Sequence, residues 1–183
     1  GLHLDGARLH LASAWTGVSI ETYASLFDTV YISQYKYLNA AFGAVLCGPA
    51  ALIDQFPLLS KLHGGAVLST WPATAMALHH LNTIEVDLQQ ARQAGDDLII
   101  RLNAIDGLSI TPLPEGTNVY TLKTAPHINP RKLTRSLFKD HNIWVRYIEE
   151  EELFKIKINA SILRQTPGEI AMAWKDAVEK SRS

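Results

Sequence analysis

The sequence contains one cysteine, no long hydrophobic run and almost no net charge. The single cysteine, Cys47, excludes a disulfide within the chain, and the lack of disulfides is typical of a reducing compartment. We therefore expect a cytoplasmic protein. The longest stretch without strongly polar side chains, residues 40–53, is shorter than the roughly 18 to 20 residues that span a bilayer. Because 17 Lys and Arg balance 18 Asp and Glu without a basic block, nucleic acid and membrane surfaces are poor candidate partners.

The composition that remains is that of a globular protein. Of the 183 residues, 47% are hydrophobic and 19% are charged, which is enough apolar surface for one domain, or for one domain with part of another. Residues 1–6 alternate in polarity like a strand, without an initiator methionine or the leader of a signal peptide. A strand at the start of a chain needs neighbours, so we expect that an N-terminal segment is missing.

The first two thirds of the chain show alternating strand and helix signals. The Ser19 hydroxyl can cap a helix, and Pro57 should interrupt one. Apolar residues recur at near-helical spacing before the Asp106-Gly107 turn. The expected elements are strands at 1–6, 29–33 and 43–46 and helices at 19–27, at 49–62, from about 71 and at 83–103.

The last third changes character and predicts a small α/β layered domain. Asn129-Pro130 has the signature of a helix start, and Thr166 with Glu169 forms a capping box. The expected elements are strands at 108–111, 119–122, 143–147 and 154–158 and helices from 130 and from 167. We place the domain boundary between residues 1–104 and residues 105–183, with the long helix as the connector.

Two residues could carry chemistry at one edge of the expected sheet. Asp5 and Lys36 are 31 residues apart and lie near the carboxyl ends of strands in one strand, helix, strand unit, where ligands of open α/β sheets gather. A lysine there can form a Schiff base with an aldehyde cofactor, and a carboxylate nearby can keep the pyridine nitrogen of pyridoxal phosphate protonated. By spacing alone, a turn aspartate and a solvated lysine are the simpler interpretation.

The sequence motifs around these two residues favour a pyridoxal-phosphate site. The segment His-Leu-Asp-Gly-Ala-Arg-Leu at 3–9 resembles a motif of threonine aldolases and the related β-eliminating lyases, which are fold type I pyridoxal-phosphate enzymes. Residues 28–36, followed by Gly-Ala-Val-Leu-Cys-Gly at 43–48, resemble the segment of that family that carries the Schiff-base lysine. The resemblance continues through 61–65 and the long helix, and in the last third it persists as element order. It implies an α/β fold, in which 1–104 form the C-terminal part of the large cofactor domain and 105–183 form the small domain.

The resemblance also implies roles for single residues. Lys36 matches the Schiff-base lysine, and Asp5 matches the partner of the pyridine nitrogen. Arg8 matches an arginine near the cofactor's phenolic oxygen and the substrate carboxylate, where its planar fork would suit the carboxylate. Ser33 matches a serine near the cofactor phosphate, although a strand serine that only bonds the backbone is an equal alternative. Where the family has a second carboxylate-binding arginine, this chain offers Lys155 or its neighbour Lys157, whose ammonium groups are poorer bidentate partners.

The sequence departs from the family pattern around the lysine. Tyr35, Tyr37 and Asn39 stand where the family has small residues, and no glycine-rich phosphate loop precedes Asp5. We predict no metal site, because His3 and Asp5 have no further ligand at a recognised spacing.

The expected function is cleavage of a threonine-like β-hydroxy-α-amino acid to glycine and an aldehyde with pyridoxal 5'-phosphate as cofactor, in a homo-oligomer that is a dimer or a tetramer. The alternatives are β-elimination from another amino acid and, in a different class, a non-catalytic fragment or interaction module. Without a phosphate loop, we expect the isolated chain to be inactive.

Overall fold

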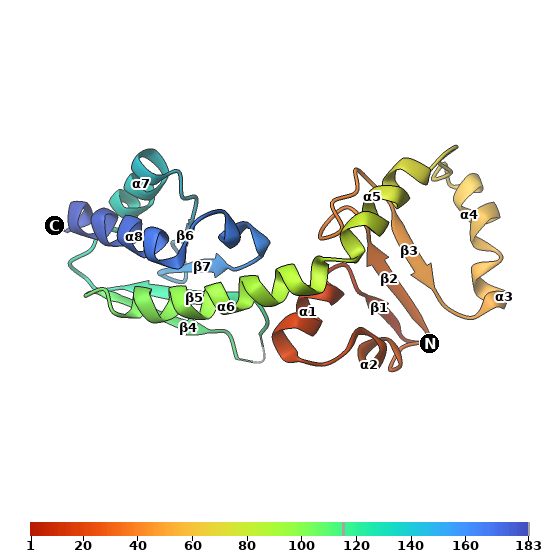
Figure 1. The fold of residues 1–183 in the computed structure, drawn as a ribbon, viewed down its shortest axis with the longest axis horizontal. Helices are drawn as coiled ribbons and strands as arrows, with labels where there is room; N and C mark the ends of the chain where they lie inside the picture. The colour runs from red at the N-terminus through yellow and green to blue at the C-terminus, as the bar shows by residue number, and fades with distance from the viewer. Residues whose placement is uncertain (115, 183) are drawn as a thin grey trace. The chain divides into compact units, whose positions relative to one another are not determined.

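The computed structural model describes residues 1–114 and 116–182, which pack as two units (Figure 1). Unit 1 comprises Gly1–Asp87 and unit 2 comprises Leu88–Ser183. The division falls within the long helix α6 (Ile84–Asn103). The assignment of 1–104 to a cofactor domain and of 105–183 to a small domain stays a prediction. In the described ranges, no helix is long and apolar enough to cross a membrane.

Unit 1 contains a three-stranded sheet in the order β1, β2, β3. Strand β1 (His3–Asp5) pairs in parallel with β2 (Thr29–Ser33), and β2 pairs antiparallel with β3 (Ala44–Cys47). Between the two parallel strands lie helices α1 (Leu9–Thr16) and α2 (Ile20–Ala24). This arrangement confirms the predicted strand, helix, strand unit, which is the geometry that parallel pairing requires.

Helix α1 is an element that the sequence did not predict. Its N-cap residue, Arg8, makes no side-chain capping bond, so the start signal is absent. The helix forms because Leu9 and Leu11 are buried and because Gly17 adopts a left-handed conformation (φ 75°), which lets its N–H donate to the Ser13 carbonyl. The next helix, α2, begins after Ser19 as predicted, since the Ser19 hydroxyl accepts from the Thr22 N–H at 3.1 Å, but it ends earlier, at Ala24.

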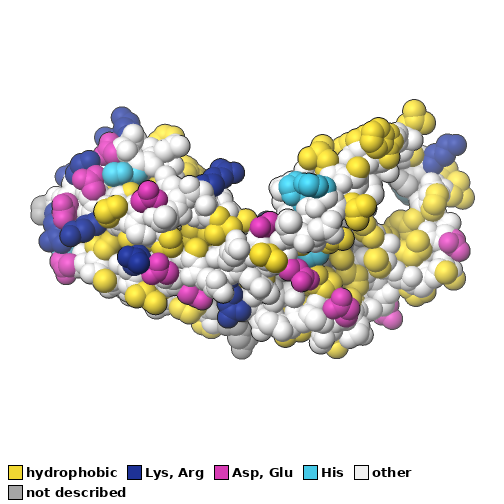
Figure 2. Space-filling model, viewed as in Figure 1, with side chains coloured by type: hydrophobic (Ala, Val, Ile, Leu, Met, Phe, Trp, Pro, Cys, Tyr) yellow, Lys and Arg dark blue, Asp and Glu magenta, His cyan; other side chains and the backbone are white. Residues whose placement is uncertain are grey.

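The rest of unit 1 is helical and leaves much apolar surface exposed. The predicted helix at 49–62 is two helices, α3 (Ala50–Ile53) and α4 (Phe56–Leu62), with Pro57 in the first turn of the second. Helix α5 (Trp71–Leu81) follows. Cys47 is exposed at the end of β3, an edge strand on which most of the residues are exposed. Figure 2 shows hydrophobic side chains gathered over α4, where Leu58 and Leu62 are 63% and 70% exposed.

Unit 2 is an antiparallel sheet with helices packed against it. The strands are β4 (Leu108–Pro112), β5 (Val119–Thr124), β6 (Arg146–Ile148) and β7 (Leu153–Lys157), in the spatial order β4, β5, β7, β6. The helices are α7 (Pro130–His141), the short 3-10 helix η1 (Ala160–Arg164) and α8 (Pro167–Ser181). Phe154 on β7 is fully buried, and its ring centroid lies 6.4 Å from that of Trp174 on α8. Strand β7 and helix α8 therefore share one apolar layer.

The predicted strand at 143–147 is wrong in position, and the cause is the end of α7. Asn142 adopts a left-handed conformation (φ 55°), and the next backbone N–H, that of Ile143, donates to the Leu137 carbonyl at 2.9 Å. This bond satisfies an orphan carbonyl of the helix. Residue 143 therefore belongs to the helix cap, and the strand begins only at Arg146.

Candidate active site

The carboxyl ends of the two parallel strands bring Asp5 close to β2. In the register of the pair, Asp5 lies opposite Tyr31, and side chains directly opposite each other share one face of a sheet. The Asp5 carboxylate is exposed and accepts the Ala7 N–H through Oδ1 at 3.1 Å. This local bond fixes the turn after β1.

Gly6 is required where β1 turns into α1. A Cβ on residue 6 would lie 2.6 Å from the Tyr31 carbonyl oxygen, closer than a carbon atom can approach. The Asp-Gly pair is therefore more than a common turn signal, because only glycine lets the chain pass this close to β2. The close approach holds Asp5 beside the end of the neighbouring strand.

Lys36 lies three residues after the end of β2 and is half-buried. Its Nζ is 5.6 Å from the centroid of the Tyr35 ring, within the range of a cation–π contact. Among the described residues no carboxylate forms an ion pair with Lys36. Its amine is therefore available for chemistry.

Two tyrosines connect the aspartate to the lysine. The Tyr31 pKa is raised, first because Tyr31 is hydrogen-bonded to Tyr35 and then because of partial desolvation and the nearby negative charge of Asp5. The series Asp5, Tyr31, Tyr35, Lys36 thus spans the carboxyl ends of both strands. From the sequence, Tyr35 was only a departure from a family pattern, and Tyr31 was not predicted as a site residue. The signal for Tyr31 was the two-residue alternation of β2, which places residue 31 on the face of Asp5 once the pairing is parallel.

The other two candidate site residues of unit 1, Arg8 and Ser33, differ in how available their side chains are to bind a ligand. Arg8 is exposed at the start of α1. Ser33 is 3% exposed, and its hydroxyl donates to the Ala7 carbonyl at 3.1 Å. That bond uses the Ser33 proton to tie β2 to the turn after β1, which is the backbone-bonding alternative. The role of Ser33 at a phosphate stays a prediction.

His10 is a further titratable group in unit 1. Its Nδ1 is buried and has no hydrogen-bond partner among the described residues. Desolvation lowers the pKa of His10, while the Glu85 carboxylate acts in the opposite direction. His10 is therefore neutral at physiological pH, a state that needs no buried counter-ion.

Lys155, the candidate for a substrate carboxylate, lies in unit 2 on β7. Its Nζ forms an ion pair with Glu151 at 3.0 Å. Lys157 follows two residues later on the same face of the strand, and no ion pair of the described residues involves it. The ammonium of Lys155 is therefore partly neutralised, and Lys157 is the less compensated of the two.

One group of side chains in unit 2 has the composition of a metal site. Ligand atoms of Asp140, His141 and Asp176 lie within 4.8 Å of one another. The Lys180 ammonium, however, is 3.0 Å from Asp140 Oδ2 and 2.7 Å from Asp176 Oδ2. A cation already stands between the two carboxylates, so the group is best described as an ion-pair network that joins α7 to α8.

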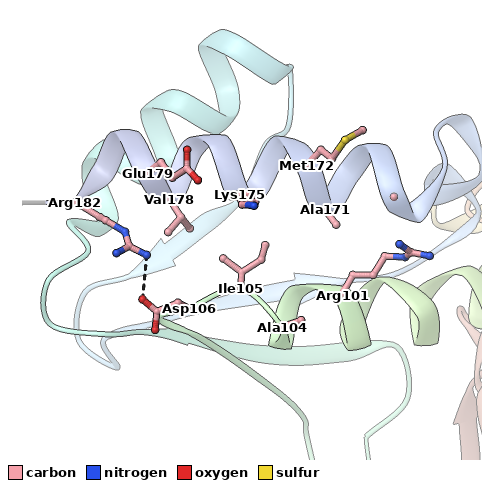
Figure 3. Close-up of a pocket in the computed structure, with 11 residues that line it drawn as sticks. Arg101, Ala104, Ile105, Asp106, Ala171, Met172, Lys175, Val178, Glu179 and Arg182 are labelled. Atoms are coloured by element: carbon pink, nitrogen blue, oxygen red, sulfur yellow. Dashed lines mark hydrogen bonds and ion pairs between the residues drawn. The ribbon is translucent and has the colours of Figure 1, made fainter.

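Unit 2 also contains two cavities, and neither is lined by residues of the Asp5 edge. The smaller has a volume of about 500 Å³ and lies between the end of α6 and α8 (Figure 3). The Arg182–Asp106 ion pair, at 3.0 Å, closes one end of it. The larger has a volume of about 750 Å³ and includes Lys155 and Lys157 in its lining.

Comparison with known proteins gives consistent results. The family model of beta-eliminating lyases matches residues 1–125. A low-specificity L-threonine aldolase of Candida albicans is 40% identical over 99 residues, which are 52% of this chain and 26% of that protein. The low-specificity L-threonine aldolase 1 of Arabidopsis thaliana is 27% identical over 165 residues, 89% of this chain and 43% of that protein.

The fold has relatives among solved structures. The threonine aldolase of Leishmania major superposes with a TM-score of 0.68 at 17% identity, covering 96% of this chain and 50% of that one. This likeness confirms the predicted α/β fold of the fold type I enzymes. The chain spans about half, or less, of the length of the proteins that it matches.

Proposed function

Because the chain belongs to the beta-eliminating lyase family, we propose that it is part of a pyridoxal-phosphate-dependent lyase that cleaves a threonine-like β-hydroxy-α-amino acid to glycine and an aldehyde. The observation that carries the proposal is the placement of Asp5 and Lys36 at the carboxyl ends of two neighbouring parallel strands. The relatives in Candida albicans and Arabidopsis thaliana are low-specificity L-threonine aldolases, which favours this substrate class.

The side chains at this edge have the chemical groups that a pyridoxal-phosphate site needs. Asp5 offers an exposed carboxylate that can hold a proton on a ring nitrogen, and Lys36 offers an amine with no ionic partner in the described part of the chain. When bound, the cofactor supplies an electron sink for the bond broken at the substrate α-carbon. The chain's own contribution is to keep the ring nitrogen protonated through Asp5 and to return a proton to the α-carbon from Lys36 Nζ.

Carboxylate binding is assigned to arginine and lysine side chains. Arg8 is exposed immediately after the Asp5 turn, and its fork can bind a substrate carboxylate in two parallel hydrogen bonds. We assign Lys155 the role of a second carboxylate partner by the same resemblance. Ser33 is assigned to the phosphate end, where its side chain anchors the turn behind Asp5 through the Ala7 carbonyl.

The working enzyme in this proposal is a homo-oligomer. Unit 1 exposes apolar side chains on α4, on α5 and in the segment between them, among them Leu68 at 105% and Trp71 at 72%. Apolar surface of this extent favours association with another protein surface. The proposed partner is a second copy, and the test is light scattering of the purified protein, which should give a mass of at least two chains.

A second candidate is β-elimination, which the name of the matching family favours. The two reactions differ in products. Aldol cleavage of threonine gives glycine and an aldehyde, whereas β-elimination expels the substituent of Cβ and, after hydrolysis of the resulting enamine, gives ammonia and a keto acid. An assay that measures aldehyde and ammonia together distinguishes them. Because the isolated chain is expected to form neither product, a non-catalytic interaction module is distinguished by the absence of a reducible adduct at Lys36.

The central experiment is to trap the lysine. The chain is incubated with pyridoxal phosphate, reduced with borohydride and digested, and the modified peptide is identified by mass spectrometry. We expect the adduct at Lys36, and its loss together with the visible absorbance in Lys36→Ala. Lys61→Ala on α4 is the matched control and should behave as wild type. Equal trapping in wild type and Lys36→Ala would contradict the proposal.

A further inference from the structure

The loop that carries Lys36 is anchored at both ends within unit 1. The Gln34 N–H donates to the Gly43 carbonyl at 3.0 Å, and the Ala40 N–H donates to the Gln34 carbonyl at 3.1 Å. Leu38 and Ala40 are only 6% and 5% exposed, so the middle of the loop is held by buried side chains. The fold therefore fixes the backbone position from which the lysine side chain extends.

Tyr35, the residue before the lysine, lies beside the reactive atom. Lys36 Nζ lies over the Tyr35 ring, 5.6 Å from its centroid. Tyr35 also shares a hydrogen bond with Tyr31, which is held in β2 by its pairing with Asp5 and Leu46. The anchored loop and the bond to Tyr31 thus hold the ring from two sides. Because Tyr35 is 47% exposed, its ring is accessible to a ligand.

Any aldehyde that bonds to Lys36 must therefore come close to this ring. In imine formation the unprotonated Nζ adds to the aldehyde carbon, and the aldehyde oxygen leaves as water with the two hydrogens of the amine. The aldehyde carbon is then one bond away from an atom that lies over the Tyr35 ring. The group that this carbon carries begins beside the tyrosine.

The aromatic character of the ring decides which group is favoured there. Two aromatic rings with centroids about 4.5–7 Å apart attract each other beyond the effect of the apolar area that they bury. An aliphatic group of the same size gains only the burial of apolar area. The attraction between two rings corresponds to a preference of roughly two- to tenfold for the aromatic group.

We propose that Tyr35 is a specificity-determining residue of the Lys36 site, where its ring favours imines of planar aromatic aldehydes over imines of aliphatic aldehydes of the same size. The family pattern has a small side chain at this position, so the selection belongs to this chain. The inference rests on the proposed function, because it concerns the same lysine, and it adds the residue that selects the aldehyde.

Two probe aldehydes of equal ring size test the selection. The full chain is incubated with benzaldehyde or with cyclohexanecarboxaldehyde and cyanoborohydride, which adds a hydride to the imine carbon and leaves a stable secondary amine. The initial yields of adduct at Lys36 and at the exposed Lys61 on α4 are measured by mass spectrometry after digestion. The selectivity is the Lys36 to Lys61 ratio for benzaldehyde divided by the same ratio for cyclohexanecarboxaldehyde, which cancels the intrinsic reactivities of the two aldehydes. We expect a selectivity of about threefold or more.

Variants assign the selection to the ring of Tyr35. Tyr35→Leu should abolish the selectivity, and Tyr35→Gln replaces it if that variant does not fold. Tyr35→Phe keeps the ring and should retain more selectivity than Tyr35→Leu, a rescue that a merely structural role of the hydroxyl does not give. Tyr37→Leu, the same substitution on the other side of the lysine, is the matched control. It should keep the wild-type selectivity, because among the described residues no cation–π contact joins Tyr37 to Lys36.

The outcomes separate this inference from the proposed function. Trapping of Lys36 by pyridoxal phosphate without any selectivity between the two probes would overturn the role of Tyr35 and leave the lysine assignment intact. Unchanged selectivity in the folded Tyr35→Leu or Tyr35→Gln variant, or an equal loss in Tyr37→Leu, would overturn that role as well. The absence of an adduct at Lys36 with pyridoxal phosphate and with both probes would overturn both proposals.

Discussion

The most direct test of the Asp5 edge is the substitution Gly6→Ala. The added Cβ would stand 2.6 Å from the Tyr31 carbonyl oxygen and 3.4 Å from Leu9 Cβ and Cδ2. The nearest atom is backbone, so it cannot rotate away. Tyr31 is paired on one side with Asp5 and on the other with Leu46, and relief of the overlap must therefore shift a strand.

The expected cost is that of overpacking, about 1–3 kcal/mol. Part of it is offset because alanine restricts the unfolded chain more than glycine does, by roughly 0.4–1 kcal/mol at most. We therefore expect a net loss of about 1–2 kcal/mol in the free energy of unfolding, which is large against the 5–15 kcal/mol typical of a domain. Because Asp5 moves with the turn, the yield of borohydride trapping at Lys36 should fall as well.

The assay is urea unfolding, followed by the fluorescence of Trp15 in a background in which the other tryptophans are replaced by phenylalanine, so that only unit 1 is observed. The control is Gly65→Ala, also in unit 1, at which an added Cβ meets only the movable Ser60 hydroxyl, at 3.2 Å, before any backbone atom. That variant should unfold like wild type or be slightly more stable, since alanine restricts the unfolded chain more than glycine does. An unchanged urea midpoint in Gly6→Ala would refute the close-approach argument.

Three further outcomes are expected. Asp5→Asn should keep the trapped lysine but lower turnover of the working enzyme at least about a hundredfold, or roughly 2.7 kcal/mol in barrier, and wild-type rates would mean that Asp5 is only a turn residue. Hydrogen bonds, from Ser136 to Asp140 and from Lys180 to Asp176, lower the pKa of each carboxyl below its ordinary value of 3.8. Their stabilisation is therefore complete above about that pH and is lost as the pH falls through the lowered values, a slope that Asp140→Asn with Asp176→Asn should reduce in acid unfolding curves. The isolated 183-residue chain with added pyridoxal phosphate should release no aldehyde from threonine at the rate of a threonine aldolase, and release at such a rate would show that a complete site is present.

Local signals in the sequence were sufficient where the chemistry is local. The Thr166 and Glu169 capping box is formed in full, and the Asn129 side chain accepts from two N–H groups at the start of α7. The long helix α6 also follows its apolar spacing. The candidate pair Asp5 and Lys36 could be placed because parallel pairing of neighbouring strands brings their carboxyl ends to one edge.

The features that were missed depend on contacts between distant residues. Cys47 is apolar in character, but its exposure depends on what covers β3, which no local pattern records. The pairing of Arg146 with Lys155 requires the register of β6 and β7, and that register is set by a turn in which Glu152 has a positive φ of 52°. A glutamate carries no signal for that conformation, so the pairing of Arg146 with Lys155 could not be predicted from the sequence.

The tyrosine pair beside Lys36 helps to divide the acid and base roles at the proposed active site. A raised pKa keeps the Tyr31 phenol protonated at neutral pH, which makes it a poor acceptor for a substrate proton. In the proposed reaction the proton is therefore returned by Lys36, while Asp5, at the other end of the series, holds the ring nitrogen protonated. Tyr31→Phe keeps the ring but removes the hydroxyl that bonds to Tyr35. It should therefore leave the pH profile of the lyase reaction nearly unchanged, whereas Lys36→Ala and Asp5→Asn should lower the rate. A bell-shaped profile that loses one limb in Tyr31→Phe would instead assign a proton transfer to the phenol.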